Sequence, residues 1–238
     1  MTDSVNEREL ALDALLSIFE KGNNSNTVLN EIFRSNKNMT KQQRAFLNML
    51  VYGTVERAIE LDYIINSFSK TKTNKMKPVI REVIRLSVYQ LKYMEQVEHF
   101  AVCNEGVKLA VKRGFSGLRG FVNGVLRNIA RSLKEITYPD TEEDYLSIFY
   151  SIPKWMIHFL LQEYGKEETI AFFESLYEKK VLTLRLNESK TSTENYIHRL
   201  EVQKINVSLG EYLPYALKLD GYNSVDTLPG FNQGEFVV

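Results

Sequence analysis

The segment from residue 118 to residue 133 separates apolar and basic residues onto two sides of a helix, and this pattern restricts the fold most. Its apolar residues recur at the spacing of one buried helix face: Leu118, Val122, Val125, Ile129 and Leu133. Every fourth residue forms a second side, here named the arginine wall: Arg119, Asn123, Arg127 and Arg131. Guanidinium groups bind phosphate oxygens in pairs, so the wall indicates an RNA partner. A solvated basic face is the alternative that this helix leaves open.

The net charge of zero hides two parts of opposite charge. Residues 1–135 contain 21 Lys and Arg against 14 Asp and Glu, a net charge of +7, whereas residues 136–238 contain nine against 16, a net charge of −7. A basic part joined to an acidic part suggests that one of them meets a polyanion. The polar run 69–77 has four lysines that would either contact phosphates without sequence preference or form a solvated loop: Lys70, Lys72, Lys75 and Lys77.

The single cysteine, Cys103, excludes an internal disulfide framework and a multi-cysteine zinc site, so we expect a reducing, cytoplasmic compartment. The charged N-terminus is unlike a signal peptide, and no apolar run approaches the ~18 residues of a membrane span, so we expect no membrane partner. The three histidines lack metal-ligand spacing, and no glycine-rich phosphate loop is present. We therefore expect no metal, no cofactor and no catalytic residue in this chain, with Cys103 an ordinary buried thiol.

The first part of the chain, residues 1–137, predicts an all-helical bundle. Apolar periodicity places helices near residues 10–20, 27–33, 40–65, 78–91, 100–112 and 118–131. Thr40 can cap the third helix, Pro78 suits a first helical turn, and Gly114 suits a C-terminal cap.

Residues 138–144 form an acidic connector with a proline, and residues 145–238 predict a small α+β subdomain. We expect helices near 153–164, 167–178 and 193–202 and strands near 181–187, 205–208 and 215–219. Alternation along the first strand directs Leu184 to one face, which we expect to pack on the helices around Trp155 and Phe172. Arg185 and Asn187 then lie on the opposite face.

Three stretches together resemble one family, the Sun or Fmu group of bacterial 16S rRNA cytosine-C5 methyltransferases, known as methyltransferase B. The helical part resembles the NusB-type RNA-binding domain at their N-terminus, through Leu50-x-x-Gly53-x-x-x-Arg57, Arg85-Leu86-x-x-Tyr89-Gln90, Asn104-Glu105-x-Val107 and Gly120-Phe121-Val122-Asn123-Gly124-Val125-Leu126-Arg127. The second part resembles the linker subdomain before the catalytic domain, through Pro153-Lys154-Trp155-Met156, Leu184-Arg185-Leu186-Asn187 and Leu228-Pro229-Gly230-Phe231-x-x-Gly234.

Several of these residues also have purely structural interpretations. Gly53 and Gly124 can permit close helix packing, Tyr89 can be a packed aromatic, and Trp155 can be a core anchor. Arg185 can pair with a carboxylate such as that of Glu201.

The resemblance implies a mainly α protein that binds ribosomal RNA through its NusB-like domain. In the family, a cysteine thiolate attacks C6 of cytosine and C5 takes a methyl group from S-adenosylmethionine, which requires a catalytic domain beyond the segment where this chain stops. The resemblance therefore implies the RNA-binding, substrate-recognition N-terminal part of a transferase of rRNA processing, inactive alone and working with the catalytic domain in cis. Arg185 and Asn187 would dock that domain or steer the RNA. The alternatives are a free-standing NusB-like RNA-binding factor of transcription antitermination and a pure protein-interaction module.

Overall fold

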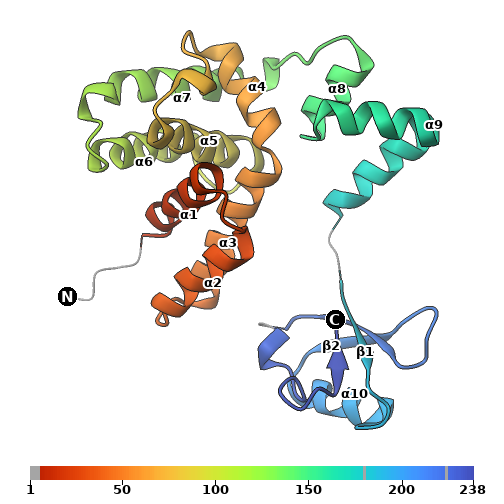
Figure 1. Cartoon of the computed structure of the whole chain (residues 1–238). Coiled ribbons are helices and arrows are strands. Elements are labelled where there is room, and N and C mark those ends of the chain that lie inside the picture. The colour runs from red at the N-terminus through yellow and green to blue at the C-terminus, as the bar shows by residue number, and fades with distance from the viewer. Residues whose placement is uncertain (1–5, 179–180, 223–224) are drawn as a thin grey trace. The chain divides into compact units, whose positions relative to one another are not determined.

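The computed structural model describes residues 6–178, 181–222 and 225–238. The chain divides into two compact units, Met1–Ala171 and Phe172–Val238. Each unit has an apolar core of its own, the first built by helices and the second by a small sheet and one helix (Figure 1).

The core of the first unit is a bundle in which α5 is the central helix. The seven helices of the bundle are α1 (Glu7–Lys21), α2 (Ser25–Ser35), α3 (Lys41–Glu56), α4 (Ala58–Phe68), α5 (Pro78–Tyr93), α6 (His99–Lys112) and α7 (Arg119–Ser132). α5 packs against α1, α3, α4, α6 and α7, so it is buried on nearly every side (Figure 1). The expected all-helical bundle is confirmed.

Local signals set most of the helix ends. Thr40 and Gln43 form a reciprocal capping box at the start of α3, and Pro78 occupies the first turn of α5. Gly22 follows α1 with φ of 70°, a left-handed conformation that glycine adopts without a Cβ penalty.

The single helix expected over residues 40–65 is wrong, because the chain turns at Arg57. Arg57 has φ of −100° and ψ of 11°, and it separates α3 from α4. The turn gives α4 a direction of its own, and Leu61, Ile64 and Ile65 are fully buried in the bundle core. No glycine or proline stands at the turn, so the sequence has no local signal for it.

The bundle continues into a connector and two further helices, α8 (Glu142–Phe149) and α9 (Lys154–Tyr177). Short 3₁₀ turns occur at η1 (Thr73–Lys75), η2 (Ser116–Leu118) and η3 (Leu133–Glu135). The connector is held to α4: the Tyr63 hydroxyl donates to the Thr137 carbonyl at 2.8 Å, and the Tyr138 hydroxyl donates to Glu60 at 2.6 Å. Gly165 interrupts α9 with φ of 77° and ψ of 178°, which agrees with the two helices expected there.

The second unit contains a four-stranded antiparallel sheet in the order β2-β3-β1-β4. Its elements are β1 (Leu182–Leu186), α10 (Thr193–Val202), β2 (Asn206–Leu209), β3 (Ala216–Asp220), η4 (Val225–Thr227) and β4 (Phe236–Val237). Leu184 pairs with Leu217, and both are buried in a cluster with Tyr196 of α10. The leucine face therefore packs on α10. The expectation that it packs on the helices around Trp155 is wrong, since Trp155 is 68% exposed and anchors no core.

None of the helices in the described part of the chain has the length and apolar character needed to cross a membrane.

Candidate nucleic-acid interface

α7 buries one face in the bundle, which positions the arginine wall. Val122, Val125, Leu126 and Ile129 are buried. Leu118 is 37% exposed, which corrects the expected stripe, because this residue belongs to η2 rather than to α7. The arginine wall thus lies on a helix whose other side is fixed by packing.

The structure brings three members of the arginine wall together. The Nε–H of Arg127 donates to Oδ1 of Asn123 at 2.8 Å, and Arg127 and Arg131 line one surface depression. Arg119 is exposed at the start of α7, and no hydrogen bond described for this chain joins it to the other three. The interface therefore has a connected part at the second half of α7 and one arginine at its first turn.

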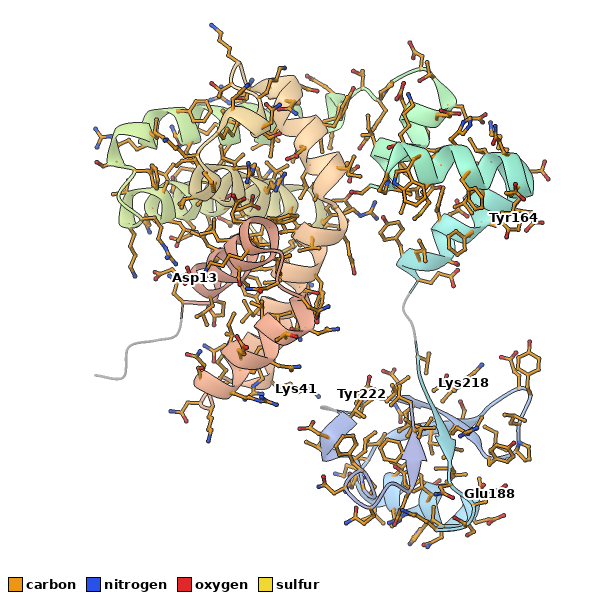
Figure 2. The ribbon with its side chains drawn as sticks, in the orientation of Figure 1. Asp13, Lys41, Tyr164, Glu188, Lys218 and Tyr222 are labelled. Carbon is orange, nitrogen blue, oxygen red and sulfur yellow. The ribbon has the colours of Figure 1, made fainter. Side chains whose placement is uncertain are left out.

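The arginines of the wall have no carboxylate partner among the described residues, unlike Arg81, Arg85 and Arg113 of the bundle. Within the described residues, no carboxylate lies within 4.0 Å of Arg119, Arg127 or Arg131, whereas Arg113 pairs with Asp13 of α1 at 2.7 Å. Figure 2 labels Asp13 on that helix. A guanidinium without a carboxylate partner keeps its terminal N–H donors for a bidentate contact with phosphate.

An aromatic ring that the sequence patterns did not single out completes the surface. Phe100 of α6 is 63% exposed, and the guanidinium carbon of Arg127 lies 5.4 Å from the centre of its ring, a cation–π distance. Phe100 shares a helix face with Asn104 and Lys108 at i+4 and i+8. An aromatic residue on a polar helix face is the sequence signal that could have pointed to Phe100.

Cys103 lies in the lining of the same depression and is almost fully buried. Burial raises the pKa of its thiol, and Arg127 lowers that pKa by a smaller amount. A buried thiol with a raised pKa is a poor nucleophile, which agrees with the structural role expected for it.

The polar run 69–77, here named the lysine loop, is attached to α4 by hydrogen bonds. Lys70, Lys72, Lys75 and Lys77 are all exposed, as a role in phosphate contact requires. Lys72 donates to the carbonyl of Asn66 at 2.6 Å, and Oδ1 of Asn66 accepts the backbone N–H of Thr73 at 2.8 Å. None of the described hydrogen bonds joins the loop to α7, so it stands as a separate basic segment.

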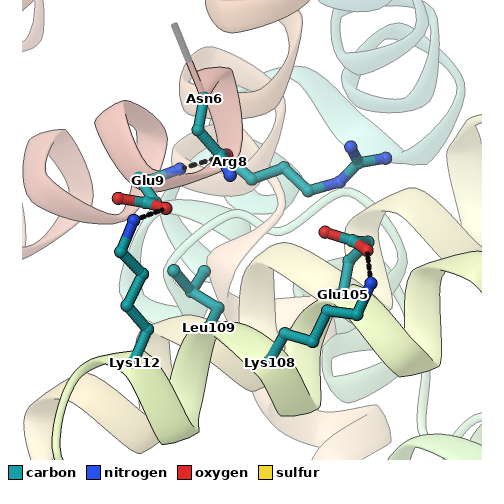
Figure 3. A pocket seen from close by; sticks show the side chains of 7 residues that line it. All are labelled: Asn6, Arg8, Glu9, Glu105, Lys108, Leu109 and Lys112. Atoms are coloured by element: carbon teal, nitrogen blue, oxygen red, sulfur yellow. Dashed lines mark hydrogen bonds and ion pairs between the residues drawn. The ribbon is translucent and has the colours of Figure 1, made fainter. Parts of the chain in front are cut away.

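A second depression in the bundle has two of its three cations paired with carboxylates of its own lining. Lys112 donates to Glu9 at 2.5 Å and Lys108 donates to Glu105 at 2.8 Å, as Figure 3 shows. Two carboxylates in the lining oppose an incoming phosphate, so this depression is a weaker candidate than the arginine wall.

Other motif residues have structural roles. An added Cβ at Gly53 would lie 2.0 Å from Cζ of Tyr89, so Gly53 permits close packing as expected. At Gly124 an added Cβ would meet nothing within 4 Å, so the same expectation there is wrong. Arg85 donates to both oxygens of Asp62 at 2.7 and 2.6 Å and to Glu82 at 2.9 Å, which makes it a buried tie between α4 and α5.

In the small unit, Arg185 and Asn187 have different surroundings. Arg185 is exposed on the face of β1 opposite the leucines, and no ion pair with Glu201 is present among the described residues. Asn187 forms a turn, since its Oδ1 accepts the hydroxyl of Ser189 at 2.6 Å. Of the two, Arg185 is the side chain available to a partner.

The described residues do not fit S-adenosylmethionine. A nucleotide-type cofactor is held where a strand leads through a glycine-rich turn into a helix. The connection from β1 to α10, residues 187–192, reads Asn-Glu-Ser-Lys-Thr-Ser and has no glycine. No step of a methyl transfer is therefore derived from these residues.

Comparison with known families decides where the chain belongs. The NusB family model matches residues 5–131, which is more than half of the chain. The chain belongs to the NusB family. A second model, described as the ferredoxin-like domain of the RsmF/B-like methyltransferases, matches residues 152–226, beyond the NusB domain.

Curated relatives match along nearly the whole chain. The probable ribosomal RNA small subunit methyltransferase B of Bacillus subtilis is 34% identical over 217 residues, which are 89% of this chain and 47% of that protein. The probable methyltransferase B of Synechocystis is 31% identical over 236 residues, 98% of this chain and 53% of that protein. This NusB-family chain thus spans about half the length of the curated relatives it matches, and the expected resemblance to methyltransferase B is confirmed.

Solved structures support the fold. The crystal structure of PH0851 has a TM-score of 0.71 and 20% identity and covers 99% of this chain and 53% of its own. The crystal structure of a plectonemic RNA supercoil has a TM-score of 0.50 and 25% identity and covers 56% of this chain and all of its own. The NusB-like fold expected from the sequence is confirmed.

Proposed function

We propose that the chain is the RNA-binding part of a cytoplasmic, S-adenosylmethionine-dependent ribosomal RNA cytosine-C5 methyltransferase. RNA binding is assigned to the NusB domain, residues 1–137, with the arginine wall as its main contact and the lysine loop as an accessory one. The observation that carries the proposal is the arginine wall, in which Arg119, Arg127 and Arg131 lack carboxylate partners in the described chain.

The relatives favour this proposal over a free-standing antitermination factor. The match to a methyltransferase ferredoxin-like domain at residues 152–226 lies outside the NusB domain. One matched structure is named for an RNA supercoil, which agrees with RNA as the ligand of this fold.

Salt dependence of RNA binding tests the proposal. With six to ten phosphate contacts, affinity is expected to fall by about 10³–10⁵-fold between roughly 50 and 200 mM salt. Replacing Arg127 and Arg131 together by alanine should weaken binding and make the logarithmic salt slope shallower by about two, one for each lost phosphate contact. The helix should stay folded because alanine is the better helix former.

A matched control removes the same charge elsewhere. Lys108→Ala with Lys112→Ala also removes two cations, but both already pair with carboxylates of the bundle. We expect the control pair to change affinity much less than the arginine pair. Equal effects of the two pairs would mean that RNA affinity depends on the overall charge of the domain and not on the arginine wall. The absence of RNA binding by the wild type at low salt would refute the proposal.

The small subdomain, residues 145–238, is proposed to connect RNA binding to methyl transfer. In the full-length protein, Arg185 and Asn187 would contact the catalytic domain in cis or the RNA that enters it, and S-adenosylmethionine would bind to that domain. Residues 1–238 should then give no heat of binding with S-adenosylmethionine in calorimetry, and micromolar binding would contradict this assignment.

The contribution of Arg185 is testable in the full-length enzyme. Arg185→Ala should fold normally, because the side chain is exposed, and should lose methylation of ribosomal RNA. Thr183→Ala is the matched control, since Thr183 is exposed on the same face of β1. Loss of activity in proportion to loss of folding would leave Arg185 only a structural role.

A further inference from the structure

The depression beside the arginine wall has the size and lining of a site for one planar ring. Its volume is about 220 Å³, below the ~300–1,000 Å³ of sites for drug-sized ligands. Its lining comes from the first two turns of α6 and the last turns of α7: His99, Phe100, Cys103, Arg127, Ala130 and Arg131. The lining contains aromatic, small and basic side chains and no carboxylate.

Phe100 keeps exposed apolar surface that a second ring can cover. Arg127 lies over its ring at 5.4 Å from the centre, yet 63% of the residue stays exposed. The exposed area is apolar, so covering it with a flat partner removes apolar surface from water. Nucleic-acid bases stack on such rings whatever their sequence, because every base has a π-face.

The positive charges beside the Phe100 ring complement the negative phosphates of an RNA strand. Asn123 fixes the Nε of Arg127 through the bond of 2.8 Å, and no described bond occupies its two terminal nitrogens. Arg131 lines the depression one helical turn further on. A base on Phe100 therefore brings its phosphates next to two guanidinium groups.

The depression shown in Figure 3 differs from the one beside the arginine wall in its lining. It is similar in size, about 180 Å³, but Glu9 and Glu105 lie in its lining and no aromatic ring does. It therefore offers a base no aromatic stacking surface, and two of its three cations, Lys108 and Lys112, already pair with carboxylates.

We propose that the depression between α6 and α7 binds one unpaired base of an RNA strand, stacked on Phe100 with its phosphates on Arg127 and Arg131. The inference rests on the proposed RNA binding and specifies the form of RNA. The bases of a duplex are stacked on one another and cannot enter, so the site selects single strands, loops or bulges. The arginine wall without Phe100 accepts either form through the backbone.

Binding of two RNA probes by the whole chain tests the proposal. The probes are a fluorescent single-stranded RNA of about ten nucleotides and a blunt duplex of the same sequence, each titrated at low salt. Phe100→Ala should weaken single-strand binding by about tenfold, because a base–aromatic stack contributes roughly 1–3 kcal/mol. Duplex binding should change by less than about twofold, since it depends on the phosphates alone. Phe100→Trp should keep single-strand affinity, and Met49→Ala, at another exposed apolar residue of the bundle, should change neither.

A fluorescent base analogue locates the contact. Single-stranded probes with one 2-aminopurine should show quenching by stacking at one position with the wild type, and no such position with Phe100→Ala. Unchanged single-strand affinity of Phe100→Ala, or equal loss for both probes, overturns the base site while RNA binding stands. Failure of the wild type to bind either probe overturns the proposed function and the base site together.

Discussion

The same substitution at two glycines of the bundle should change stability in opposite directions. Gly53 and Gly124 both lie inside helices, α3 and α7. Replacing a helical glycine by alanine favours the folded state by about 1 kcal/mol, because glycine loses more backbone entropy on folding. The surroundings of the new methyl group then decide the outcome.

At Gly124 the methyl group meets no atom within 4 Å, so the full gain of about 1 kcal/mol is expected. At Gly53 the methyl group would lie 2.0 to 2.4 Å from two ring carbons and the hydroxyl oxygen of Tyr89, far inside contact distance. The ring has little freedom to withdraw, since Tyr89 is only 9% exposed and stacks on Tyr93 at 5.4 Å between centres. Overpacking costs about 1–3 kcal/mol, so Gly53→Ala should be less stable than the wild type.

Urea unfolding followed by far-ultraviolet circular dichroism measures both effects, with the thermal midpoint as a second readout. Gly124→Ala should raise the midpoint by about 2–4 °C and Gly53→Ala should lower it. Adding Tyr89→Leu to Gly53→Ala removes the ring, so the two changes should be strongly coupled in a double-mutant cycle. A stable Gly53→Ala with no coupling to position 89 would refute the close packing between α3 and α5.

Two further predictions concern ionisable groups of the first unit. Burial and a hydrogen bond to Glu60 raise the pKa of Tyr138, so the folded state keeps a proton that the unfolded state loses above pH ~10, and stability should fall as the pH rises beyond that value. Tyr138→Phe should make this alkaline decline shallower in urea titrations at several pH values, and an unchanged decline would contradict the assignment. Arg85→Met should cost about 1–3 kcal/mol, because it leaves the fully buried Glu82 with Arg81 as its remaining arginine partner, and burial already raises the pKa of Glu82. Glu82→Gln added to Arg85→Met should recover part of that loss of stability. If nothing is recovered, the loss does not come from the buried charge of Glu82.

The helices that the sequence predicted have an apolar stripe, and several of them also have a local end signal. α5 begins at Pro78 and α1 is followed by Gly22, so periodicity and caps agreed. The turn at Arg57 and the helix α8 were missed for different reasons. No glycine or proline stands at the turn at Arg57. α8 begins with three acidic residues, so its sequence resembled a connector.

The arginine wall was visible from spacing, because its residues lie on one helix. Phe100 is 27 residues away from Arg127 in the sequence, and only the packing of α6 on α7 brings them together. The second strand partner of β1 was missed for a similar reason: β4 has two residues, and Phe236 pairs with Leu186 across 50 positions. Long-range pairing of short segments leaves no periodic trace in a sequence.

The border of the NusB sequence family and the border of its fold do not coincide in this protein. The family match ends at residue 131, yet the backbone N–H of Ile59 donates to the Ser151 hydroxyl at 3.0 Å and Arg57 donates to the Phe149 carbonyl at 3.0 Å. A fragment that ends at residue 131 would expose the outer side of α4, and Glu60 would lose its hydrogen bond from the Tyr138 hydroxyl. Dissection of this protein into working pieces should therefore follow the bonds of α4 and place the first cut after Ile152, beyond the Ser151 hydroxyl.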